Sequence, residues 1–289
     1  MTREAITQLC ALLNNDRQPM GFGGHPMPVA LKVALNFYTC GSFRDQPATC
    51  VGSLNQQCTA AFMRSLTRRA GDYVHFRTDP ESQAEMAIGF RITAGFPQVK
   101  GVIDCMHVAI KAPTEQLAAF INRAFTPTTS NLCMTQEALH ASVCLFPRQL
   151  SQVLLLCTPS AQLQGWSLGD KGYPLMIWLL TPVRNPSKNA GEHYNTCHGS
   201  TQATIEQAIG MLKMLFHCLD SSGGAQQYAP DRVGCIIVVC CVLHNIAVQS
   251  GEALQDEEVW EQDTFSDDED TEGNQEQPLM GAQRAIMEG

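Results

Sequence analysis

The chain has 289 residues, of which 44% are hydrophobic and 16% charged, so it is long enough to form one or two domains with a buried core. Its 13 cysteines are scattered without a paired Cys-x-x-Cys set, which argues against a disulfide framework or a zinc site. We therefore expect buried reduced thiols and a reducing compartment. No uninterrupted run of about 18 apolar residues occurs, so no membrane-spanning helix is expected.

The net charge of −9 is unevenly distributed along the chain. Residues 251–289 hold 13 of the 28 acidic residues and one arginine, which leaves 15 acidic and 18 basic residues in 1–250. The acidic segment has few apolar residues and is predicted to be a disordered tail. The remainder is mildly basic, which permits nucleic-acid binding without requiring it.

The first 95 residues are predicted to be mostly helical. Apolar residues recur at helical spacing in 5–13, and a Gly-Ser turn at 52–53 leads into a helical pattern that runs to Leu66. This turn and helix suit the second half of a helix-turn-helix, and a plain helical hairpin, the commoner arrangement, also accounts for them. The motif Gly95-Phe-Pro97 then breaks the pattern and marks a domain boundary.

An apolar run at Gly101–Pro113 carries a single carboxylate, Asp104, in its middle. Val102, Ile103 and Val108 favour a strand, and the glycine and the proline delimit it. A charge inside a core strand costs several kcal/mol unless it is compensated. A metal ion and a buried hydrogen-bond partner are both possible compensations, and this run alone does not choose between them.

Two further acidic residues lie in similar settings downstream. A short strand predicted from Trp166 ends at Asp170, before a turn rich in Gly and Pro. A helix predicted over Thr201–Phe216 carries Glu206 beside its apolar face. An Asp on one strand, an Asp ending another and a Glu on a following helix are an arrangement that can gather two Mg²⁺ ions roughly 4 Å apart for phosphodiester cleavage.

A series of short motifs then follows an order typical of one protein family: Phe37–Phe43, Ala94–Pro97, Gly101–Pro113, Leu168–Pro174, Trp178–Pro182, Tyr194-Asn195 with His198, Ile205-Glu206 and Cys240–Asn245. With these motifs the chain resembles the Harbinger transposase-derived nucleases, domesticated relatives of PIF/Harbinger transposases. The motifs extend from residue 37 to residue 245.

The resemblance implies an α/β fold in which a ribonuclease-H-like DDE nuclease domain at 96–250 follows a helical, helix-turn-helix-like N-terminal region at 1–95. It implies Asp104, Asp170 and Glu206 as the catalytic residues and as ligands of a divalent metal cation, Mg²⁺ or Mn²⁺. It further implies a DNA phosphodiester substrate without independent transposition. A separate Myb-like DNA-binding partner protein and a location in the nucleus, and also in the cytoplasm, are expected. No association with a membrane is expected.

Residues 124–160 depart from the family pattern, which has there a strand ending in Asp and then a Pro-Gly-Ser motif. This chain has no aspartate between Asp104 and Asp170. One interpretation is a reading-frame error: codon degeneracy permits 124–138, read from the third codon base, to encode a stretch ending Tyr-Asp-Thr-Arg-Gly. In the same way Phe146–Ser151, read from the second base, can encode Ser-Pro-Gly-Ser-Cys-His. Ordinary divergence is the alternative.

Two further departures concern the same region and the predicted site. The breaker cluster Thr126–Ser130 stands where a core strand needs β-branched residues, so we expect 124–160 to be irregular or poorly packed. The family pattern also has arginine where His193, Gln202 and Leu215 stand. Arginine can hold phosphates or carboxylates with two parallel hydrogen bonds, and these residues cannot.

Two functions are therefore expected. The first is a metal-dependent nuclease in which Lys111, Arg123 and Lys171 are candidate phosphate contacts. The second is a catalytically inactive DNA- or protein-interaction module, a degraded family member that lacks the central Asp motif.

Three other polar residues are placed outside the predicted site. His107 is three positions beyond Asp104, so alternation along a strand puts it on the opposite side. His244 and Asn245 lie in an apolar helical pattern and are predicted to be a hydrogen-bonded pair of the core rather than ligands.

Overall fold

The computed structural model describes residues 6–7, 9–11, 21–22, 25–26, 60–74, 79–111, 128–129, 131–137, 140–146, 165–186, 189–220, 225–226 and 228–249. In the ranges 21–26 and 128–146 it describes only the backbone. The predicted tail at 251–289 and most of the predicted N-terminal helical region lie outside these residues. The helix at 60–68 agrees with the helical pattern that runs to Leu66, and the turn before it lies outside.

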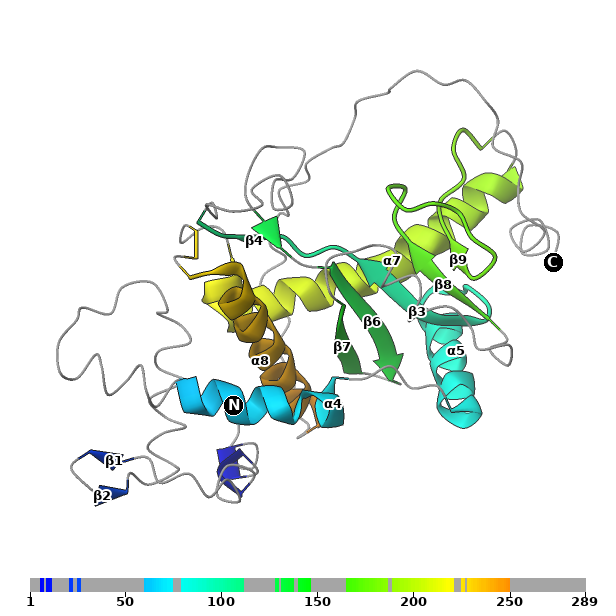
Figure 1. Cartoon of the computed structure of the whole chain (residues 1–289). Helices are drawn as coiled ribbons and strands as arrows, with labels where there is room; N and C mark the ends of the chain where they lie inside the picture. The colour runs from blue at the N-terminus through cyan, green and yellow to red at the C-terminus, as the bar shows by residue number, and fades with distance from the viewer. Residues whose placement is uncertain are drawn as a thin grey trace.

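A five-stranded sheet forms the centre of the structure (Figure 1), in the order β7-β6-β3-β8-β9. Its strands are β3 (Val99–Asp104), β6 (Asn131–Glu137), β7 (His140–Phe146), β8 (Trp166–Gly169) and β9 (Leu179–Leu180). The central strand is β3, and the buried side chains of Val99, Val102 and Ile103 explain the apolar run seen in the sequence.

The direction of the strands changes at β3. Strand β6 is antiparallel to β3, and β7 is antiparallel to β6. Strand β8 is parallel to β3, with Ile103 opposite Gly169 as the last pair, and β9 is parallel to β8. Because parallel strands end at the same edge of a sheet, Asp104 at the end of β3 and Asp170 after β8 lie at one edge.

The prediction that 124–160 is irregular is wrong for two parts of this segment. Residues 131–137 and 140–146 are the strands β6 and β7, and they pair in continuous register from Asn131 opposite Phe146 to Glu137 opposite His140. The breaker cluster Thr126–Ser130 precedes these strands instead of interrupting them, which is why it does not prevent pairing.

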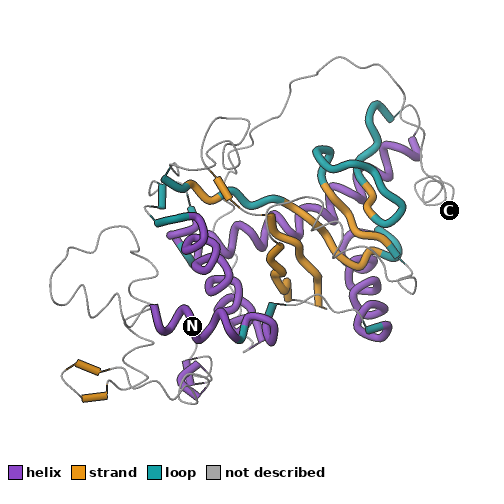
Figure 2. Tube along the Cα trace, viewed as in Figure 1, coloured by secondary structure: helices purple, strands orange, loops and turns teal. Residues whose placement is uncertain are grey.

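The helices surround this sheet, as Figure 2 shows. They are α4 (Ala70–Tyr73), α5 (Pro80–Ala94), α7 (Asn189–Leu215), the short 3₁₀ helix η2 (His217–Leu219) and α8 (Pro230–Gln249). Helices α5 and α7 pack against each other and against β3, whereas α8 lies beside β7 and α4. Short strands β1 (Gly21–Phe22) and β2 (His25–Pro26) pair with each other, as do β4 (Val108–Ala109) and β5 (Thr128–Thr129).

Local sequence explains both ends of α5. Asp79 is the N-cap and accepts a hydrogen bond from the Ser82 amide at 2.8 Å, and Pro80 occupies the first helical position. Gly95 ends the helix in the left-handed conformation at φ 73°, which a residue without a side chain adopts most easily. Gly95 is therefore where α5 ends and the chain turns toward β3, against which α5 packs; the division into domains at this point stays a prediction.

Helix α8 forms much of the core. It is long and apolar enough to cross a membrane by length and composition, yet 72% of its apolar stretch is buried inside the protein. A helix that is apolar on all sides suits the interior of a domain. His244 and Asn245 are both buried in it, as predicted. The Asn245 side-chain amide donates to the Tyr73 carbonyl at 2.7 Å, so the observed hydrogen bond joins α8 to α4.

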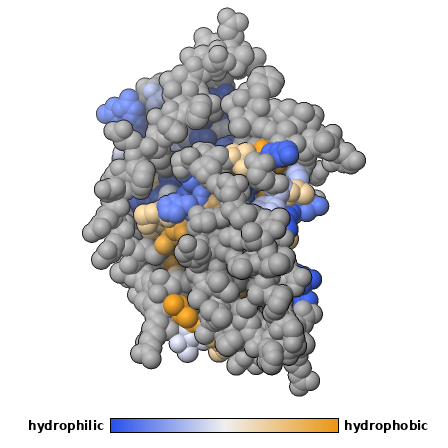
Figure 3. Space-filling view, turned by 90° about the vertical axis from the view of Figure 1, so that its left-hand side faces the viewer, coloured by the Kyte–Doolittle hydropathy of each residue, from blue (hydrophilic) through white to orange (hydrophobic). Residues whose placement is uncertain are grey.

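The described surface carries few large apolar side chains. Ile88 and Ile92 on α5 and Ile177 before β9 are exposed. In the described part of the face in Figure 3, hydrophilic residues are interspersed with small hydrophobic areas. Single exposed apolar residues of this kind are ordinary on protein surfaces.

Candidate functional site

Two of the three predicted acidic residues lie side by side at the edge where β3 and β8 end. Asp104 is the last residue of β3, and Asp170 directly follows β8. The parallel pairing of the two strands ends at Ile103 and Gly169, so each aspartate is one residue beyond the last backbone pair. Asp104 is half-buried, whereas Asp170 is exposed.

The third residue, Glu206, reaches the same edge from α7. The buried face of this helix, with Ile205, Ala208 and Leu212, turns toward the core because these residues recur at helical spacing. Helix α7 lies against β3 and β8, and the Gln202 side-chain amide donates to the Ile103 carbonyl at 3.3 Å. Glu206 is one turn beyond Gln202 and is half-buried.

The three carboxylates are within electrostatic reach of one another. Burial raises the pKa of Asp104 to about 6, the hydrogen bond from the Cys105 amide opposes this shift, and the negative charges of Glu206 and Asp170 raise the pKa further. Burial also raises the pKa of Glu206, and the charge of Asp170 adds to the effect. The three acids predicted from the sequence therefore interact in the folded chain.

The carboxylates do not form a closed ligand cluster, however. Among the residues that the structure describes, no three His, Cys, Asp or Glu side chains lie close enough to hold one ion. An oxygen of Asp104 accepts from the Cys105 amide at 2.7 Å, and an oxygen of Asp170 accepts from the Lys171 amide. Each aspartate thus has one oxygen bonded to the backbone amide that follows it.

A lysine that sequence reasoning missed faces this site. The positive charge of Lys213 on α7 lowers the pKa of Asp104, which places it within electrostatic reach of that carboxylate. Lys213 is seven residues after Glu206, and a spacing of seven keeps two residues on one face of a helix. This spacing is the signal by which the sequence could have indicated it.

Strand alternation does not place His107 on the opposite side from Asp104, contrary to the prediction. Burial lowers the pKa of His107 and the charge of Lys213 lowers it further, so His107 lies near the same end of α7. Strand β3 ends at Asp104, and residues 105–107 are not in a strand. Alternation along a strand therefore says nothing about the side on which His107 lies.

Cys105 and Tyr173 were also missed, and they lie between the two aspartates. The Cys105 sulfur and the Tyr173 hydroxyl are 2.9 Å apart. Burial raises the pKa of the Cys105 thiol, the bond to Tyr173 opposes this, and the charges of Asp104 and Asp170 raise the pKa further. No residue pattern indicated this contact because its partners are 68 positions apart.

The loop between β9 and α7 is fixed by three residues of the first turns of α7. Asn195 bonds the amide and the carbonyl of Val183, both at 2.9 Å, and the Tyr194 hydroxyl donates to the Thr181 carbonyl at 3.2 Å. His198 is buried, with its Nε2 at 3.4 Å from the Leu180 carbonyl oxygen. These contacts fix the end of β9 and the loop after it to the first part of α7.

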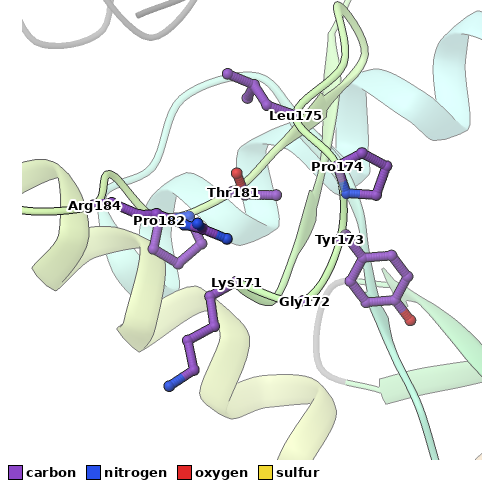
Figure 4. A pocket seen from close by; sticks show the side chains of 8 residues that line it. All are labelled: Lys171, Gly172, Tyr173, Pro174, Leu175, Thr181, Pro182 and Arg184. Carbon is purple, nitrogen blue, oxygen red and sulfur yellow. The ribbon is translucent and has the colours of Figure 1, made fainter. Parts of the chain in front are cut away.

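A hollow of about 260 Å³ opens beside the turn that follows Asp170. Its lining includes two cations, Lys171 and Arg184, as well as Thr181 and Pro182. Figure 4 shows Tyr173 on the opposite side of the loop from Lys171 and Arg184. Of the other candidate phosphate contacts, Lys111 is exposed and Arg123 lies outside the described residues.

Comparison with known proteins assigns the family. Residues 103–245, which include all three acids, match a family profile described as "DDE superfamily endonuclease". "Putative nuclease HARBI1" of Bos taurus is 36% identical over 75% of this chain and 66% of its own length. The Xenopus laevis protein of the same name is 30% identical over 76% of this chain and 67% of its length.

The chain belongs to the Harbinger transposase-derived nuclease family. "Protein ALP1-like" of Arabidopsis thaliana is a more distant relative, 24% identical over 89% of this chain and 71% of its length. No solved structure matches the chain. The chain spans about two thirds of the length of the vertebrate relatives, at 66% for the bovine protein.

Two of the three positions where this Harbinger-family chain lacks the expected arginine are on the surface. His193 and Leu215 are exposed on α7. Gln202, by contrast, is 7% exposed, and its Oε1 has no hydrogen-bond partner among the described residues. The replacement at Gln202 therefore alters the interior beside Asp104, whereas the other two alter the surface.

Proposed function

We propose that this chain is a transposase-derived nuclease that uses a divalent metal ion to hydrolyse DNA phosphodiester bonds, without independent transposition. The observation that carries the proposal is that Asp104, Asp170 and Glu206, from β3, the end of β8 and α7, interact electrostatically at one edge of the sheet. The strand order supports a ribonuclease-H-like fold, because three antiparallel strands, β7-β6-β3, continue into the parallel strands β8 and β9.

The three residues fit a divalent cation by their chemistry. Carboxylate oxygens are the ligands that Mg²⁺ and Mn²⁺ prefer. Burial, together with the negative charges of Glu206 and Asp170, raises the pKa of Asp104, and a bound cation would relieve the repulsion among these charges. When bound, such an ion stabilises the negative charge that develops on a phosphodiester during hydrolysis. Asp104, Asp170 and Glu206 would hold it.

Nearby cations give the chain a way to place the DNA backbone. Lys171 follows Asp170 directly, and Arg184 lines the same hollow. Lys213 faces Asp104 from α7. Lysine and arginine contacts to phosphates position a duplex without reading its sequence. These residues would hold the strand beside the three carboxylates.

The partner and the location are parts of the same proposal. The mildly basic 1–250 segment can contact DNA, and the family resemblance implies that a separate Myb-like DNA-binding protein would select the sequence. Cys218, Cys240 and Cys241 are buried in the core, and buried thiols of this kind suit a reducing compartment such as the nucleus or the cytoplasm.

Melting curves with and without Mn²⁺ test the metal site. At 100 times its dissociation constant, Mn²⁺ should add about 2.7 kcal/mol to the free energy of unfolding of the wild type. Asp104→Ala and Glu206→Gln should lose most of this gain. Glu192→Gln, which removes an exposed carboxylate from the first turn of the same helix, should keep it. An unchanged midpoint in the wild type, or an equal gain in Asp104→Ala, would exclude the site.

A catalytically inactive DNA- or protein-interaction module is the second candidate. Two observations favour it: the chain has no aspartate between Asp104 and Asp170, and the described residues form no closed ligand cluster. Such a module would bind DNA or a protein with no change when Mn²⁺ is added, and it would not cleave a plasmid. Retained DNA binding together with absent Mn²⁺ binding would identify it.

A further inference from the structure

The backbone alone does not fix the distance between the two aspartates. The parallel pairing of β3 with β8 ends at Ile103 and Gly169, so Asp104 and Asp170 extend one residue beyond it. Asp104 still pairs with Leu132 of β6, but neither aspartate is paired with the other's strand, and two carboxylates at one edge repel each other. A contact between the two chain segments would oppose this repulsion.

A side-chain contact spans the two segments at this point. The Cys105 sulfur lies 2.9 Å from the Tyr173 hydroxyl oxygen, within hydrogen-bonding distance. Cys105 is the residue after Asp104, and its backbone amide donates to the Asp104 carboxylate at 2.7 Å. The contact therefore begins at a residue that is itself bonded to the first aspartate.

At the other end of the contact, Tyr173 is hydrogen-bonded directly to Asp170. The Tyr173 amide donates to the Asp170 carbonyl at 3.0 Å and closes the turn after β8. The Tyr173 ring fills the space beside Gly169, where an added Cβ would be 3.2 Å from the ring carbon Cδ2. Tyr173 thus bonds the residue that follows β8 and packs on the residue that ends it.

We propose that Cys105 and Tyr173 are positioning residues whose contact, the Cys105–Tyr173 tie, holds together the two chain segments that carry Asp104 and Asp170, the residues that would bind a divalent cation. The inference rests on the proposed function, because it assigns a role in the same metal site. Neither Cys105 nor Tyr173 would be a ligand of the cation. Their role is to hold two like-charged segments in place beyond the end of the backbone pairing.

The test measures the dissociation constant of Mn²⁺ alone for the full chain by titration calorimetry. Tyr173→Phe and Cys105→Ala each remove the tie and should weaken Mn²⁺ binding about fivefold, the effect of losing one hydrogen bond. Cys105→Ser replaces the thiol with a hydroxyl that can keep the hydrogen bond to Tyr173, so this variant should retain most of the wild-type Mn²⁺ affinity. The double variant Tyr173→Phe with Cys105→Ala should bind no more weakly than either single variant, because both remove the same contact.

Tyr194→Phe is the matched control. It also removes one tyrosine hydroxyl bond in this domain, to the Thr181 carbonyl at 3.2 Å, but that bond does not join the two aspartates. Its melting temperature without metal should fall about as much as that of Tyr173→Phe, and its Mn²⁺ affinity should stay within twofold of the wild type, roughly the scatter of such contacts.

The outcomes separate the two proposals. Mn²⁺ binding by the wild type that Tyr173→Phe and Cys105→Ala leave unchanged overturns the tie and keeps the nuclease proposal. Equal weakening in Tyr194→Phe also overturns the tie, because general loosening then explains the effect. A wild type that binds no Mn²⁺ overturns both proposals, since no metal site is left to arrange.

Discussion

At the scale of single residues, Asp104 is a carboxylate whose charged form is disfavoured by its surroundings. Burial is the first cause of its raised pKa, and the charges of Glu206 and Asp170 add to it. Because the pKa of Asp104 is raised to about 6, its charged form is destabilised in the folded state without metal. Burying Asp104 therefore lowers the folding stability at pH values where the group is charged.

The pH dependence of stability follows from this shift. The unfolded Asp104 loses its proton near pH 4, whereas the folded group keeps it to about pH 6. The folded state therefore binds more protons between these values, and stability in EDTA should fall as pH rises from about 4 to 6. Because Asp104→Asn cannot titrate, the wild type should lose about 2–3 kcal/mol relative to it over this range.

Chemical denaturation in EDTA at pH 4, 6 and 8 measures this difference. Comparing the two proteins at each pH cancels the titrating groups that do not interact with Asp104. If the difference in unfolding free energy is the same at all three values, Asp104 titrates normally, and the proposed crowding of carboxylates is wrong.

At the scale of elements, the entry into β8 decides where Asp170 lies. Gly165 precedes this strand with φ 142°, and an added Cβ would be 2.5 Å from Lys100 Cε and 2.7 Å from the Gln98 carbonyl oxygen. The Trp166 amide donates to that same carbonyl at 3.1 Å. The first residues of β8 can pair with the chain before β3 only because a residue without a side chain stands here.

A pair of glycine substitutions with opposite expected signs tests this. Gly165→Ala should destabilise the chain by about 1–3 kcal/mol, because the backbone conformation is strained for alanine and the backbone oxygen cannot give way. Gly210→Ala on the exposed side of α7 meets nothing within 4 Å and should stabilise by about 0.5–1 kcal/mol. Thermal unfolding of both measures the effects. A neutral Gly165→Ala would contradict the account of the β8 entry.

At the scale of the whole molecule, the segment 124–160 affects the fold and the activity in different ways. It supplies β6 and β7, so the sheet is complete on that side of β3. It supplies no aspartate, whereas the family pattern has one there. A sheet can therefore form from residues that do not restore the expected chemistry, because strand pairing uses the backbone and catalysis uses particular side chains.

A plasmid-cleavage assay with Mn²⁺ compares the chain as it stands with one in which 124–160 carries the frame-restored residues. We expect the restored chain to cleave and the present chain to cleave weakly or not at all. Asp170→Asn in each background is the control for the active site. Cleavage by the present chain at the restored rate, lost in Asp170→Asn, would refute the inactivation and leave the nuclease proposal intact.

The sequence by itself determined the family, the central strand at Asp104, the C-terminal end of α5 at Gly95 and the helix that carries Glu206, although this helix begins at Asn189 and not at the predicted Thr201. These features depend on local patterns: apolar periodicity, capping residues and motifs in a fixed order. His244 and Asn245 could be placed in the core for the same reason, since an apolar helix surrounds them. The sequence also indicated three acids, without showing that they interact.

Only the tertiary structure decided which residues meet at the edge of the sheet. Cys105 and Tyr173 are 68 positions apart and carry no signature, and Lys213 reaches Asp104 because α7 crosses the ends of β3 and β8. The prediction of an irregular segment at 124–160 failed because breaker residues were judged without knowing where the strands begin. Contacts between distant segments depend on how the elements pack, and local residue patterns carry no record of that packing.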